Sequence, residues 1–480
     1  MTDLTPRTPT NRPLLWSDMI LDLQDALLAL SISDPLYIVG GAVRDALLHR
    51  PTKDIDLATP TQSIAIARQI ANQRDGDIYV MDDERGVARV LIDTPDGRMV
   101  IDVANFREAD LLADLQERDF TINAMACDLL GDLNKLIDPL GGEADLNEKR
   151  LRRCSPHALA DDPIRTLRAV RQSVQLGFRL DPATREDCRA HAVDLMTTSN
   201  ERVRDEFFAL LSLQRATAAL RVAEALGLLQ QIIPPLAQLK GQTLPAPHVY
   251  DGWKHTLESV TKLSHLLTTI SYSRTDNTAA TFGMGMVAMQ FDRYRSQLNA
   301  HIGRTFPDQR SYAALMMLAA LLHRIPDHAG QIANTLRLSN PEKQIIVRAI
   351  KAYQQVLALD HTDDLSLHRY WHRHQAQGID VILLALAVYL ATYGNELRQD
   401  DWLLQVERAT VMLAAFYDRH ETLVAPPPLL DGRDLMRELD LDGGRMIGDL
   451  LTIIREGQVT GAITTREQAL HVAREHVQAQ

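Results

Sequence analysis

Hydrophobic and polar positions follow two different patterns along the chain of 480 residues. Between residues 36 and 140, apolar runs of strand length are interspersed with helical spacings. Strands are expected at 36–40, 53–58, 77–81, 87–92 and 98–103, and helices near 42–49, 61–72 and 119–129. Beyond residue 146, apolar residues recur at the spacing of amphipathic helices. The pattern predicts an α+β fold class, with a mixed sheet and helices first and an all-α neck, body and tail after it.

Clusters of glycine and proline mark the expected domain boundaries, at 138–146, 233–247 and 423–432. We therefore expect four parts: an α+β head at 14–146, a helical neck at 147–235, a helical body at 245–422 and a small helical tail at 428–480. Two local signals add detail. Asp96-Gly97 between two apolar runs predicts a hairpin, and Thr464 with Glu467 predicts a capping box for the last helix.

The overall composition is that of a soluble globular protein, with 45% hydrophobic and 24% charged residues. No apolar run reaches the roughly 18 residues that a membrane span needs, and the first residues lack the apolar core of a secretory signal. Three cysteines without a CxxC spacing argue against a disulfide framework and against a thiolate zinc site. We expect a cytoplasmic protein with no membrane partner.

The stretch GGAVRDALLHRPTKDIDLAT, residues 40–59, carries the first candidate chemistry. Asp54 and Asp56 lie two apart in an expected strand, so their carboxylates project from one face. Neighbouring carboxylates are costly unless a cation lies between them, and such oxygen ligands suit Mg²⁺. Asp102, on a later expected strand, is the best candidate for a third carboxylate. The predicted catalytic residues are Asp54, Asp56 and Asp102, with Mg²⁺ held by Asp54 and Asp56.

The glycine pair at the start of this stretch predicts a phosphate site. Gly40 and Gly41 stand at a strand-to-helix turn, where free backbone N–H groups and the helix dipole favour a phosphate. Arg44, one turn into the helix, could add a cation. Taken singly, the glycines are explained as a simple turn and the aspartates as a polar strand edge. Their occurrence together within 17 residues, with no evident protein nucleophile, favours nucleotidyl transfer with two metal ions.

Five segments of the chain, in a fixed order, resemble the motifs of a known family. After residues 40–59 come ERDFTINAMA (117–126), DPLGGEADL (138–146), DDPIRTLRAVR (161–171) and ERVRDEF (201–207). They are similar to the motifs of the class II tRNA nucleotidyltransferase (CCA-adding enzyme) and bacterial poly(A) polymerase family. The resemblance covers about residues 36–210. It implies a nucleotidyltransferase head in which the two aspartates of the DxD pair bind metal and the residues of the glycine turn contact the triphosphate.

The resemblance also implies that the nucleotide is bound by a further segment of the head. Arg118, Asp119 and Asn123, within ERDFTIN, are expected to recognise the ribose.

Base selection can be interpreted from DDPIRTLR, because Asp162 and Arg165 are three residues apart and are expected to share one helix face. An aspartate accepts a hydrogen bond from an amine, and an arginine donates to ring nitrogens or carbonyls. Cytosine and adenine present an amine beside a ring acceptor, whereas uracil and guanine present an oxygen instead of the amine. The pair is therefore expected to accept C and A, a role that the resemblance also implies. A plain ion pair is the alternative. We include Arg168 among the nucleotide-binding residues.

The net charge of −12 argues against a nucleic-acid partner on average, but basic residues are concentrated at 149–171. Solvated helix faces are one explanation of this cluster. If an RNA end lies beside the nucleotide, the cluster instead predicts an RNA-binding surface. The expected RNA-binding residues are Arg152, Arg153, Arg171, Arg202 and Arg204.

Two regions depart from the family pattern. Only ten residues separate NFR (105–107) from RDF (118–120); in family members that add C, C and A, this connection is longer and is linked to the switch from CTP to ATP. The shortened connection makes the final A step doubtful, and addition of CCA, of CC alone or of A, and poly(A) synthesis therefore remain open.

The second departure is in the body, where HVYDGWKHTL (248–257) and ALLHRIP (320–326) resemble the HD phosphohydrolase pattern. Arg324 replaces its metal-binding aspartate and would repel a divalent ion, so we expect a degenerate HD-like fold without hydrolysis. A metal-dependent phosphohydrolase is the rival function. The cluster His368, His372 and His374 has spacing that could hold zinc, but interleaved arginines favour a solvated helix face.

These observations predict a template-independent RNA nucleotidyltransferase. It is expected to add CMP and/or AMP from CTP and ATP to the 3′ end of tRNA with release of pyrophosphate. Its expected partners are tRNA or another RNA 3′ end and the two nucleotides, and its expected cofactor is Mg²⁺. The oligomeric state is left open.

Overall fold

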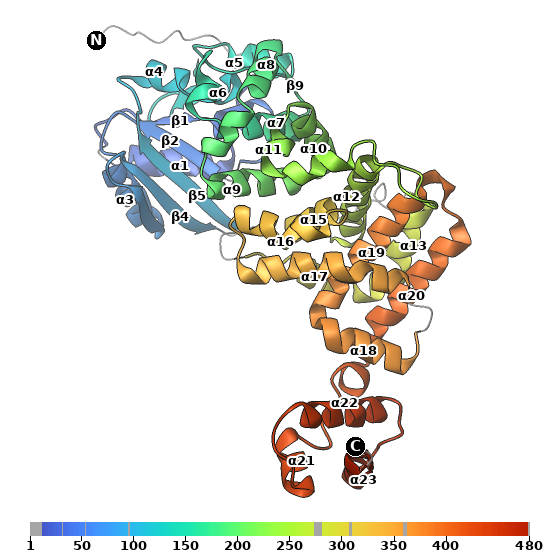
Figure 1. Ribbon diagram of the computed structural model, residues 1–480. Coiled ribbons are helices and arrows are strands. Elements are labelled where there is room, and N and C mark those ends of the chain that lie inside the picture. The colour runs from blue at the N-terminus through green and yellow to red at the C-terminus, as the bar shows by residue number, and fades with distance from the viewer. Residues whose placement is uncertain are drawn as a thin grey trace. The chain divides into compact units, whose positions relative to one another are not determined.

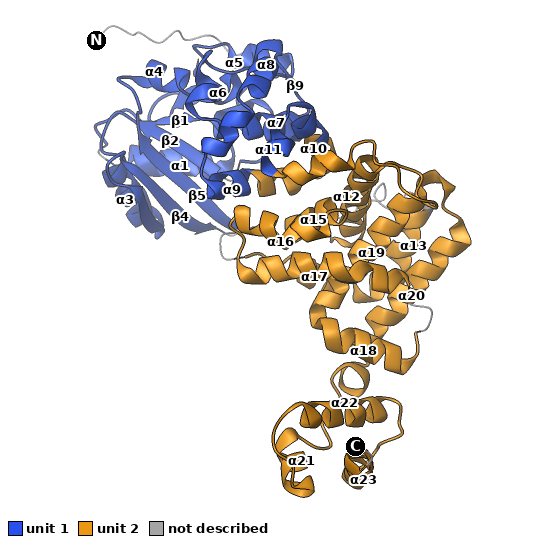
Figure 2. Cartoon of the chain, in the orientation of Figure 1, with its two compact units in different colours: residues 1–206, 221–232 blue, residues 207–220, 233–480 orange. Residues whose placement is uncertain are grey.

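The structure is a computed structural model that describes residues 12–30, 32–52, 54–94, 97–272, 281–306, 310–358 and 362–478. The chain divides into two compact units (Figure 2). Unit 1 comprises Met1–Glu206 and Arg221–Ile232, and unit 2 comprises Phe207–Leu220 and Ile233–Gln480. The finer division into head, neck, body and tail at the expected boundaries stays a prediction.

Unit 1 is built on a mixed sheet (Figure 1). Among the described residues this sheet has seven strands. The strand order is β3-β4-β5-β2-β1-β6-β7. Their bounds are β1 (Tyr37–Val39), β2 (Asp54–Thr59), β3 (Asp77–Asp82), β4 (Val87–Thr94), β5 (Gly97–Asn105), β6 (Ala126–Asp128) and β7 (Leu136–Ile137). The first five lie within a few residues of the expected strands. The mixed sheet of the α+β prediction is thereby confirmed.

The central pairing of the sheet is the parallel one between β2 and β5, whereas the other strand pairs are antiparallel. In this register Asp56 is the partner of Asp102. Strand β4 pairs with β5 up to Thr94 and Gly97, which confirms the hairpin; its expected turn residue Asp96 lies outside the described residues. The residues of β2 alternate between exposed and buried only at Asp54, Ile55 and Asp56, and from Leu57 onward they are all buried.

The helices of the sheet region are α1 (Asp18–Leu28), α2 (Gly41–Leu47), α3 (Ser63–Arg74), α4 (Leu111–Gln116) and α5 (Gly142–Asn147). Helix α3 packs against β3, β4 and β5. Helix α4 contributes Leu111 and Leu115 to a core on the sheet that also contains Val39 and Ala58. Because Ala58 is two residues after Asp56, the same face of β2 begins with acidic residues and ends in a hydrophobic core.

The helix expected at 119–129 is wrong. The segment forms a short 3-10 helix at Thr121–Asn123 and then strand β6, which pairs with β1. All residues from Asp119 to Cys127 are buried. A continuous buried run has neither the helical nor the strand period, so periodicity could not separate the two.

The remaining helices of unit 1 are α6 (Ala158–Asp161), α7 (Ile164–Leu176), α8 (Pro182–Ala190) and α11 (Leu228–Ile232), while α9 (Asn200–Leu211) and α10 (Ala216–Ala225) cross the division between the units. The expected neck is not purely helical. Strands β8 (Arg150–Leu151) and β9 (Arg179–Leu180) form a parallel pair. Two-residue strands are too short to leave a periodic signal.

The regular elements of unit 2 are helices among its described residues (Figure 1), apart from one isolated β-bridge between Thr305 and Ser311. Its first part contains α12 (Gly252–Ile270), α13 (Phe282–Gln290), α14 (Arg295–Ile302), α15 (Tyr312–Leu322), α16 (Pro326–Thr335), α17 (Asn340–Leu357), α18 (Asp364–His374), α19 (Gly378–Tyr393) and α20 (Gln399–Asp418). The stretch Asp364–Glu396 is long and apolar enough to cross a membrane, but most of it is buried inside the protein. We interpret it as part of the core of unit 2.

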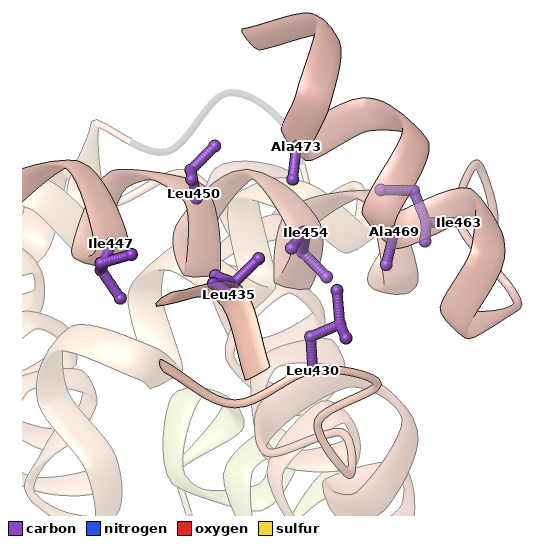
Figure 3. Packing of buried hydrophobic residues seen from close by; sticks show 8 residues of the cluster. All are labelled: Leu430, Leu435, Ile447, Leu450, Ile454, Ile463, Ala469 and Ala473. Carbon is purple, nitrogen blue, oxygen red and sulfur yellow. The ribbon is translucent and has the colours of Figure 1, made fainter. Parts of the chain in front are cut away.

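The C-terminal helices of unit 2 are α21 (Gly432–Leu439), α22 (Arg445–Val459) and α23 (Arg466–Gln478). They enclose a small core of their own, shown in Figure 3, to which Leu435, Leu450 and Ala469 contribute. The capping box of α23 lies one residue later than expected. Thr465 Oγ1 accepts from the Gln468 N–H at 3.3 Å, and Gln468 Oε1 accepts from the Thr465 N–H at 3.2 Å. Thr464 also donates to Gln468, so adjacent threonines made the choice ambiguous.

Candidate active site

The turn between β1 and α2 lies directly against the carboxylate of Asp56. Gly40 has a φ of 73°, a left-handed conformation that favours glycine. A Cβ at this position would be 3.1 Å from Asp56 Oδ2 and 3.2 Å from Arg118 Nη1. The glycine therefore lets the turn, a carboxylate and a guanidinium approach one another closely. This contact joins segments that are far apart in the sequence.

The two backbone N–H groups of the turn differ in availability. The Gly40 N–H donates to the Met125 carbonyl oxygen at 3.3 Å, so the expectation that it is free for a phosphate is wrong. Gly41 is the first residue of α2, where the helix itself provides no acceptor for its N–H. Arg44 donates two hydrogen bonds to Asp45, at 2.9 and 3.0 Å, and one to Asn123 Oδ1 at 2.7 Å. Its guanidinium is thus fixed beside the turn.

Asp54 and Asp56 are both exposed and lie on one face of β2, as predicted. Among the described residues, neither carboxylate forms an ion pair. The pKa of Asp56 is raised because the surrounding protein removes part of its hydration, and because Asp102 and Asp54 add negative charge; Arg118 opposes the rise. The structure therefore gathers negative charge here that is only partly compensated, an arrangement that a bound cation would stabilise.

The third predicted carboxylate, Asp102, lies beside Asp56 in the register but already has a cationic partner. Its two oxygens accept from Arg89 Nε and Nη2 at 2.7 and 2.8 Å. In the described part of the chain, no group of three or more His, Cys, Asp or Glu side chains forms a metal site. Asp54 and Asp56 fit a divalent cation because they offer oxygen donors and their charge is only partly compensated, whereas Asp102 is neutralised by Arg89. Arg89 was not predicted from the sequence, because it lies on β4, two strands away from β2 in the sheet order.

A hydrogen-bonded network connects Arg44 to α7 through the ERDFTIN segment. Asn123 accepts from Arg44, and its Nδ2 donates to Asp119 Oδ1 at 2.9 Å and to Gln172 Oε1 at 3.0 Å. Asp119 Oδ2 accepts from Arg168 Nη1 at 3.2 Å. The structure thus brings together four predicted residues. Gln172 was missed, although it lies four residues after Arg168 and so on the same face of α7.

Asp119 is buried and remains acidic. Burial alone would raise the pKa of its carboxyl, but the Arg168 guanidinium and the hydrogen bonds from Asn123 and from the Phe120 N–H hold this pKa below its ordinary value. Arg118, the preceding residue, donates from Nη2 to Asp114 Oδ2 at 3.2 Å. Asp114 is buried on α4 and was also missed. The adjacent residues Arg118 and Asp119 therefore place a positive and a negative charge at the site, each held in position by its own partner.

Asp162 and Arg165 do not share a helix face, so that expectation is wrong. Asp162 is extended, with φ −143° and ψ 93°, and α7 begins only at Ile164. The cause is Pro163, because a proline disfavours the helical conformation of the residue before it. Asp162 Oδ2 is 3.9 Å from Arg165 Nε and accepts from Arg202 Nη2 at 2.7 Å.

The guanidinium of Arg165 is buried and fixed by backbone carbonyls. It donates to the carbonyl oxygens of Glu117 at 2.8 Å and Ala158 at 3.0 Å. These contacts orient the side chain and use only some of its five donors. Arg165 is therefore a rigid group with donors to spare.

The predicted RNA-binding arginines are mostly engaged with acidic residues of unit 1. Arg152 donates to Asp145 and to the Leu140 carbonyl oxygen. The other pairs are Arg153 with Asp187, Arg171 with Glu206, Arg202 with Asp162 and Arg204 with Asp205. The side chain of Arg202 is 52% exposed, whereas that of Arg204 is 10% exposed. The basic run of the sequence is therefore largely neutralised in the fold.

The HD-like fragments of unit 2 place three histidines next to one another. The ring centroids of His248 and His255 are 4.9 Å apart, and those of His255 and His323 are 5.3 Å apart. Burial, with the neighbouring His323, lowers the pKa of His255 to about 2. Burial, with Arg324, lowers that of His323 to about 4. His255 and His323 are therefore neutral near pH 7. The described residues form no metal site here.

The second histidine cluster is not a solvated helix face, so that interpretation is wrong. His368 and His374 are buried. His368 Nδ1 lies 2.6 Å from the Leu423 carbonyl oxygen. The described residues bring no zinc site together here.

Three family models match the chain. Residues 36–152 match the "Poly A polymerase head domain", residues 177–239 the "Probable RNA and SrmB-binding site of polymerase A", and residues 307–473 the tRNA nucleotidyltransferase domain 2. An A-adding tRNA nucleotidyltransferase of Deinococcus radiodurans is 33% identical over 447 residues, which cover 90% of this chain and 93% of the relative. The chain belongs to the tRNA nucleotidyltransferase family.

Other relatives of this tRNA nucleotidyltransferase carry a different named activity. A CC-adding enzyme of Geobacter sulfurreducens is 30% identical over 435 residues, or 90% of each chain. Among solved structures, the Thermotoga maritima CCA-adding enzyme complexed with tRNA matches with a TM-score of 0.58 and 20% identity over 96% of each chain. This likeness confirms the predicted fold. Members of the family generally use divalent metal ions.

Proposed function

We propose that the protein transfers CMP and/or AMP from CTP and ATP to the 3′ end of tRNA and releases pyrophosphate, without a nucleic-acid template. Membership of the family supports the reaction class. The observation that carries the assignment to this site is the approach of the Gly40 turn to Asp56 and Arg118, at 3.1 and 3.2 Å from the position of a Cβ. It joins an acidic pair to the start of a helix.

The proposed metal is Mg²⁺, which Asp54 and Asp56 would hold. When bound, it would activate the terminal hydroxyl of the RNA and stabilise the pyrophosphate leaving group. This choice is supported by the oxygen donors of the two aspartates and by their negative charge, which is only partly compensated. Asp102 belongs to the same face, and we propose that it shapes the charge of the site while paired with Arg89.

The protein's own groups would bind and orient the triphosphate. The Gly41 N–H and the Arg44 guanidinium are the proposed phosphate contacts, because both lie at the start of α2. Arg118 Nη1 faces the same turn. We further propose that Asp119 and Asn123 bind the ribose, since a carboxylate and an amide can pair with its hydroxyl groups. Arg168 would act by holding Asp119 ionised.

Base selection is proposed to depend on Asp162 and Arg165. Asp162 can accept from the amine of cytosine or adenine, and the spare donors of Arg165 can reach a ring acceptor. Uracil and guanine would place a carbonyl oxygen against the carboxylate. Arg202, which now pairs with Asp162, would compete with the base for this carboxylate.

The tRNA itself would meet the site through the basic residues of unit 1. Arg202 has the most exposed side chain of the five predicted RNA-binding arginines. The side chains of the other four are less exposed, so we propose that they position local structure as well as RNA. We place the protein in the cytoplasm, where tRNA is processed in bacteria, with no membrane partner.

The test is incorporation of labelled CTP and ATP, separately, into tRNA transcripts that end before the CCA tail, after C and after CC. The proposal expects incorporation into at least one transcript and its loss in Asp56→Asn, with tRNA binding retained. Asp93→Asn is the matched control, because Asp93 is an exposed acid on β4 whose side chain is 86% exposed. Activity retained in Asp56→Asn would contradict the assignment.

The same assay separates the activities that the sequence leaves open. ATP use only on the CC-ended transcript would define an A-adding enzyme, CTP use alone a CC-adding enzyme, and both a CCA-adding enzyme. Long A tracts on any RNA would define a poly(A) polymerase. The short connection at 107–118 includes α4, whose Leu111 and Leu115 are in the core. We propose that this anchoring limits nucleotide switching, which favours a partial activity.

A further inference from the structure

A cavity of about 640 Å³ in unit 2 is lined by ten residues, of which half are basic and none is acidic. Its walls come from α17 and from the C-terminal end of α18, both labelled in Figure 1. Five lining residues are basic: Lys343, Arg348, Lys351, Arg373 and His374. This composition is unusual in a chain whose net charge is −12. It suggests an anionic ligand.

The sequence of α17 explains why one of its faces lines the cavity. Lys343, Val347, Arg348 and Lys351 recur at helical spacing, and their positions therefore fall on one face. Residues between them, including Ile346 and Ile350, are buried against the rest of unit 2. The helix is thus amphipathic, but its solvent side is basic instead of mixed in charge.

The cations of this cavity differ from the arginines of unit 1, because none of them forms an ion pair within the part of the chain that the structure describes. Lys343 Nζ donates to the Asn334 amide oxygen at 3.0 Å, and Arg348 Nη1 donates to the His374 carbonyl oxygen at 3.4 Å. Lys351 and Arg373 are exposed. Four positive charges are therefore gathered without a carboxylate to neutralise them.

His374 adds a buried polar group to the cavity. The residue is only 4% exposed, and neither ring nitrogen has a hydrogen-bond partner. Burial, with Arg348 and Arg373, lowers the pKa of its imidazole to about 4. The ring is therefore neutral near pH 7 and has one N–H group to donate. A buried donor without an acceptor is costly, so an acceptor in the cavity would relieve that cost.

We propose that this cavity is a second phosphate-binding site, separate from the candidate active site. Lys343 and Lys351 are eight residues apart, which corresponds to about 12 Å along a helix. Charges spread over that length suit several phosphate groups better than one. The source is either the backbone of an RNA or a free polyphosphate such as pyrophosphate. Only the naming of tRNA as the RNA rests on the proposed function.

The test compares two double variants with equal changes in charge. Lys351→Gln/Arg373→Gln removes two exposed cations from the cavity. Arg293→Gln/Arg398→Gln removes two exposed cations elsewhere in unit 2, whose side chains are 72% and 77% exposed. Binding of a tRNA transcript is measured by fluorescence anisotropy at several salt concentrations, and binding of pyrophosphate is measured by calorimetry.

For an RNA source, we expect the cavity variant to bind tRNA about tenfold more weakly than the control, with a salt dependence that is shallower by about one to two ions. For a free polyphosphate source, pyrophosphate binding is weakened and tRNA binding is unchanged. His374→Phe keeps the buried ring and removes its hydrogen-bonding nitrogens, so it should weaken the same ligand with an unchanged melting temperature. Equal affinities of cavity and control variants for both ligands would overturn the proposal.

The outcome is distinguishable from failure of the proposed function. Loss of nucleotide incorporation in a protein that still binds tRNA concerns Asp54 and Asp56. A cavity variant that binds its ligand more weakly, but still incorporates nucleotide at saturating tRNA, would support the cavity proposal and leave the proposed function unaffected. A protein that incorporates no nucleotide at all can still be tested, because both binding measurements need no reaction.

Discussion

Arg89 and Asp102 form a bidentate ion pair across the neighbouring strands β4 and β5, with hydrogen bonds of 2.7 and 2.8 Å. The pair stands beside Asp56, whose partner in the sheet is Asp102. It provides a positive charge next to the acidic face and leaves Asp54 and Asp56 as the carboxylates without ion pairs among the described residues. Asp102 therefore differs in its chemistry from the other two aspartates.

This difference predicts a graded loss of activity. Asp54→Asn and Asp56→Asn should lower the rate of nucleotide incorporation by about a thousandfold or more, because they remove proposed metal ligands. Asp102→Asn should lower it by about tenfold. Arg89→Met should lower the rate by a similar factor. The double variant Arg89→Met/Asp102→Asn should be no slower than either single variant, because both changes break the same interaction. A loss in Asp102→Asn as large as that in Asp56→Asn, with Arg89→Met near normal, would instead make Asp102 a direct ligand.

The network on α7 predicts that nucleotide affinity depends on Arg168. In Arg168→Met, Asp119 loses the cation that holds its pKa down. We expect the KM for the nucleotide to rise about tenfold and the free energy of unfolding to fall by about 1–3 kcal/mol, since a buried charged acceptor loses a partner. Steady-state kinetics and urea denaturation measure the two effects. The control is Arg185→Met on α8, an exposed residue. An unchanged KM would show that Asp119 does not serve the nucleotide.

A buried ion pair in unit 2 predicts a large loss of stability. Glu342 accepts from Arg310 Nε and Nη2 at 2.9 and 3.0 Å, and both side chains are buried. Glu342→Gln should lower the free energy of unfolding by about 3–5 kcal/mol, because it leaves a buried guanidinium uncompensated. Arg310→Met/Glu342→Leu should lose less, because no charge is left behind. Urea denaturation, followed through the helical signal, gives both values. Equal losses in the two variants would show that packing dominates.

The histidines of unit 2 predict the pH dependence of stability. His255 and His323 have lowered pKa values in the folded protein, about 2 and about 4, whereas an unfolded histidine titrates near about 6.5. Their contribution is fully present above about pH 6.5. It is lost as the pH falls toward about 4, because the unfolded chain then binds protons that the folded protein excludes, at up to about 1.4 kcal/mol per pH unit for each histidine.

The measurement is the melting temperature between about pH 7 and about pH 4.5. His323→Asn keeps a donor for the Ala320 carbonyl oxygen but cannot titrate, so its curve should be flatter than that of the unchanged protein. His471→Asn is the control, since that side chain is 72% exposed. Curves of equal slope would contradict the assignment of a neutral His323.

The sheet and its acidic face could be predicted from the sequence because their signals are local. Asp54 and Asp56 share a face by strand geometry alone, and the glycine turn is visible as two adjacent letters. The partner of Asp102 is not local. Arg89 reaches it through the pairing of β4 with β5, and one arginine within an apolar run does not show which carboxylate it will meet. The same holds for the acidic partners that neutralise the basic residues near α7.

The errors have equally specific causes. Residues 119–127 are all buried, so the apolar residues of this segment lack the period that separates a helix from a strand. Asp162 left the helix because of Pro163, a rule that was readable in the sequence. The cavity at α17 could not be predicted, because the sequence does not show that the end of α18 packs beside α17. It also does not show which side chains line the space between them.

The parallel pairing of β2 with β5 has a consequence for how the protein folds. Because side chains alternate along a strand, a slip of β5 by one residue would turn Asp102 to the opposite face and bring Ile101 or Val103 level with Asp56. A slip by two would keep the face but move the carboxylate by roughly 7 Å. A one-residue slip would also turn the buried Ile101 and Val103 away from the core, which costs stability, whereas a two-residue slip would keep the alternation of buried and exposed residues. An activity assay would therefore detect molecules in which β5 has slipped along β2. Spectroscopy and size measurements would count such molecules as native when the slip is by two residues.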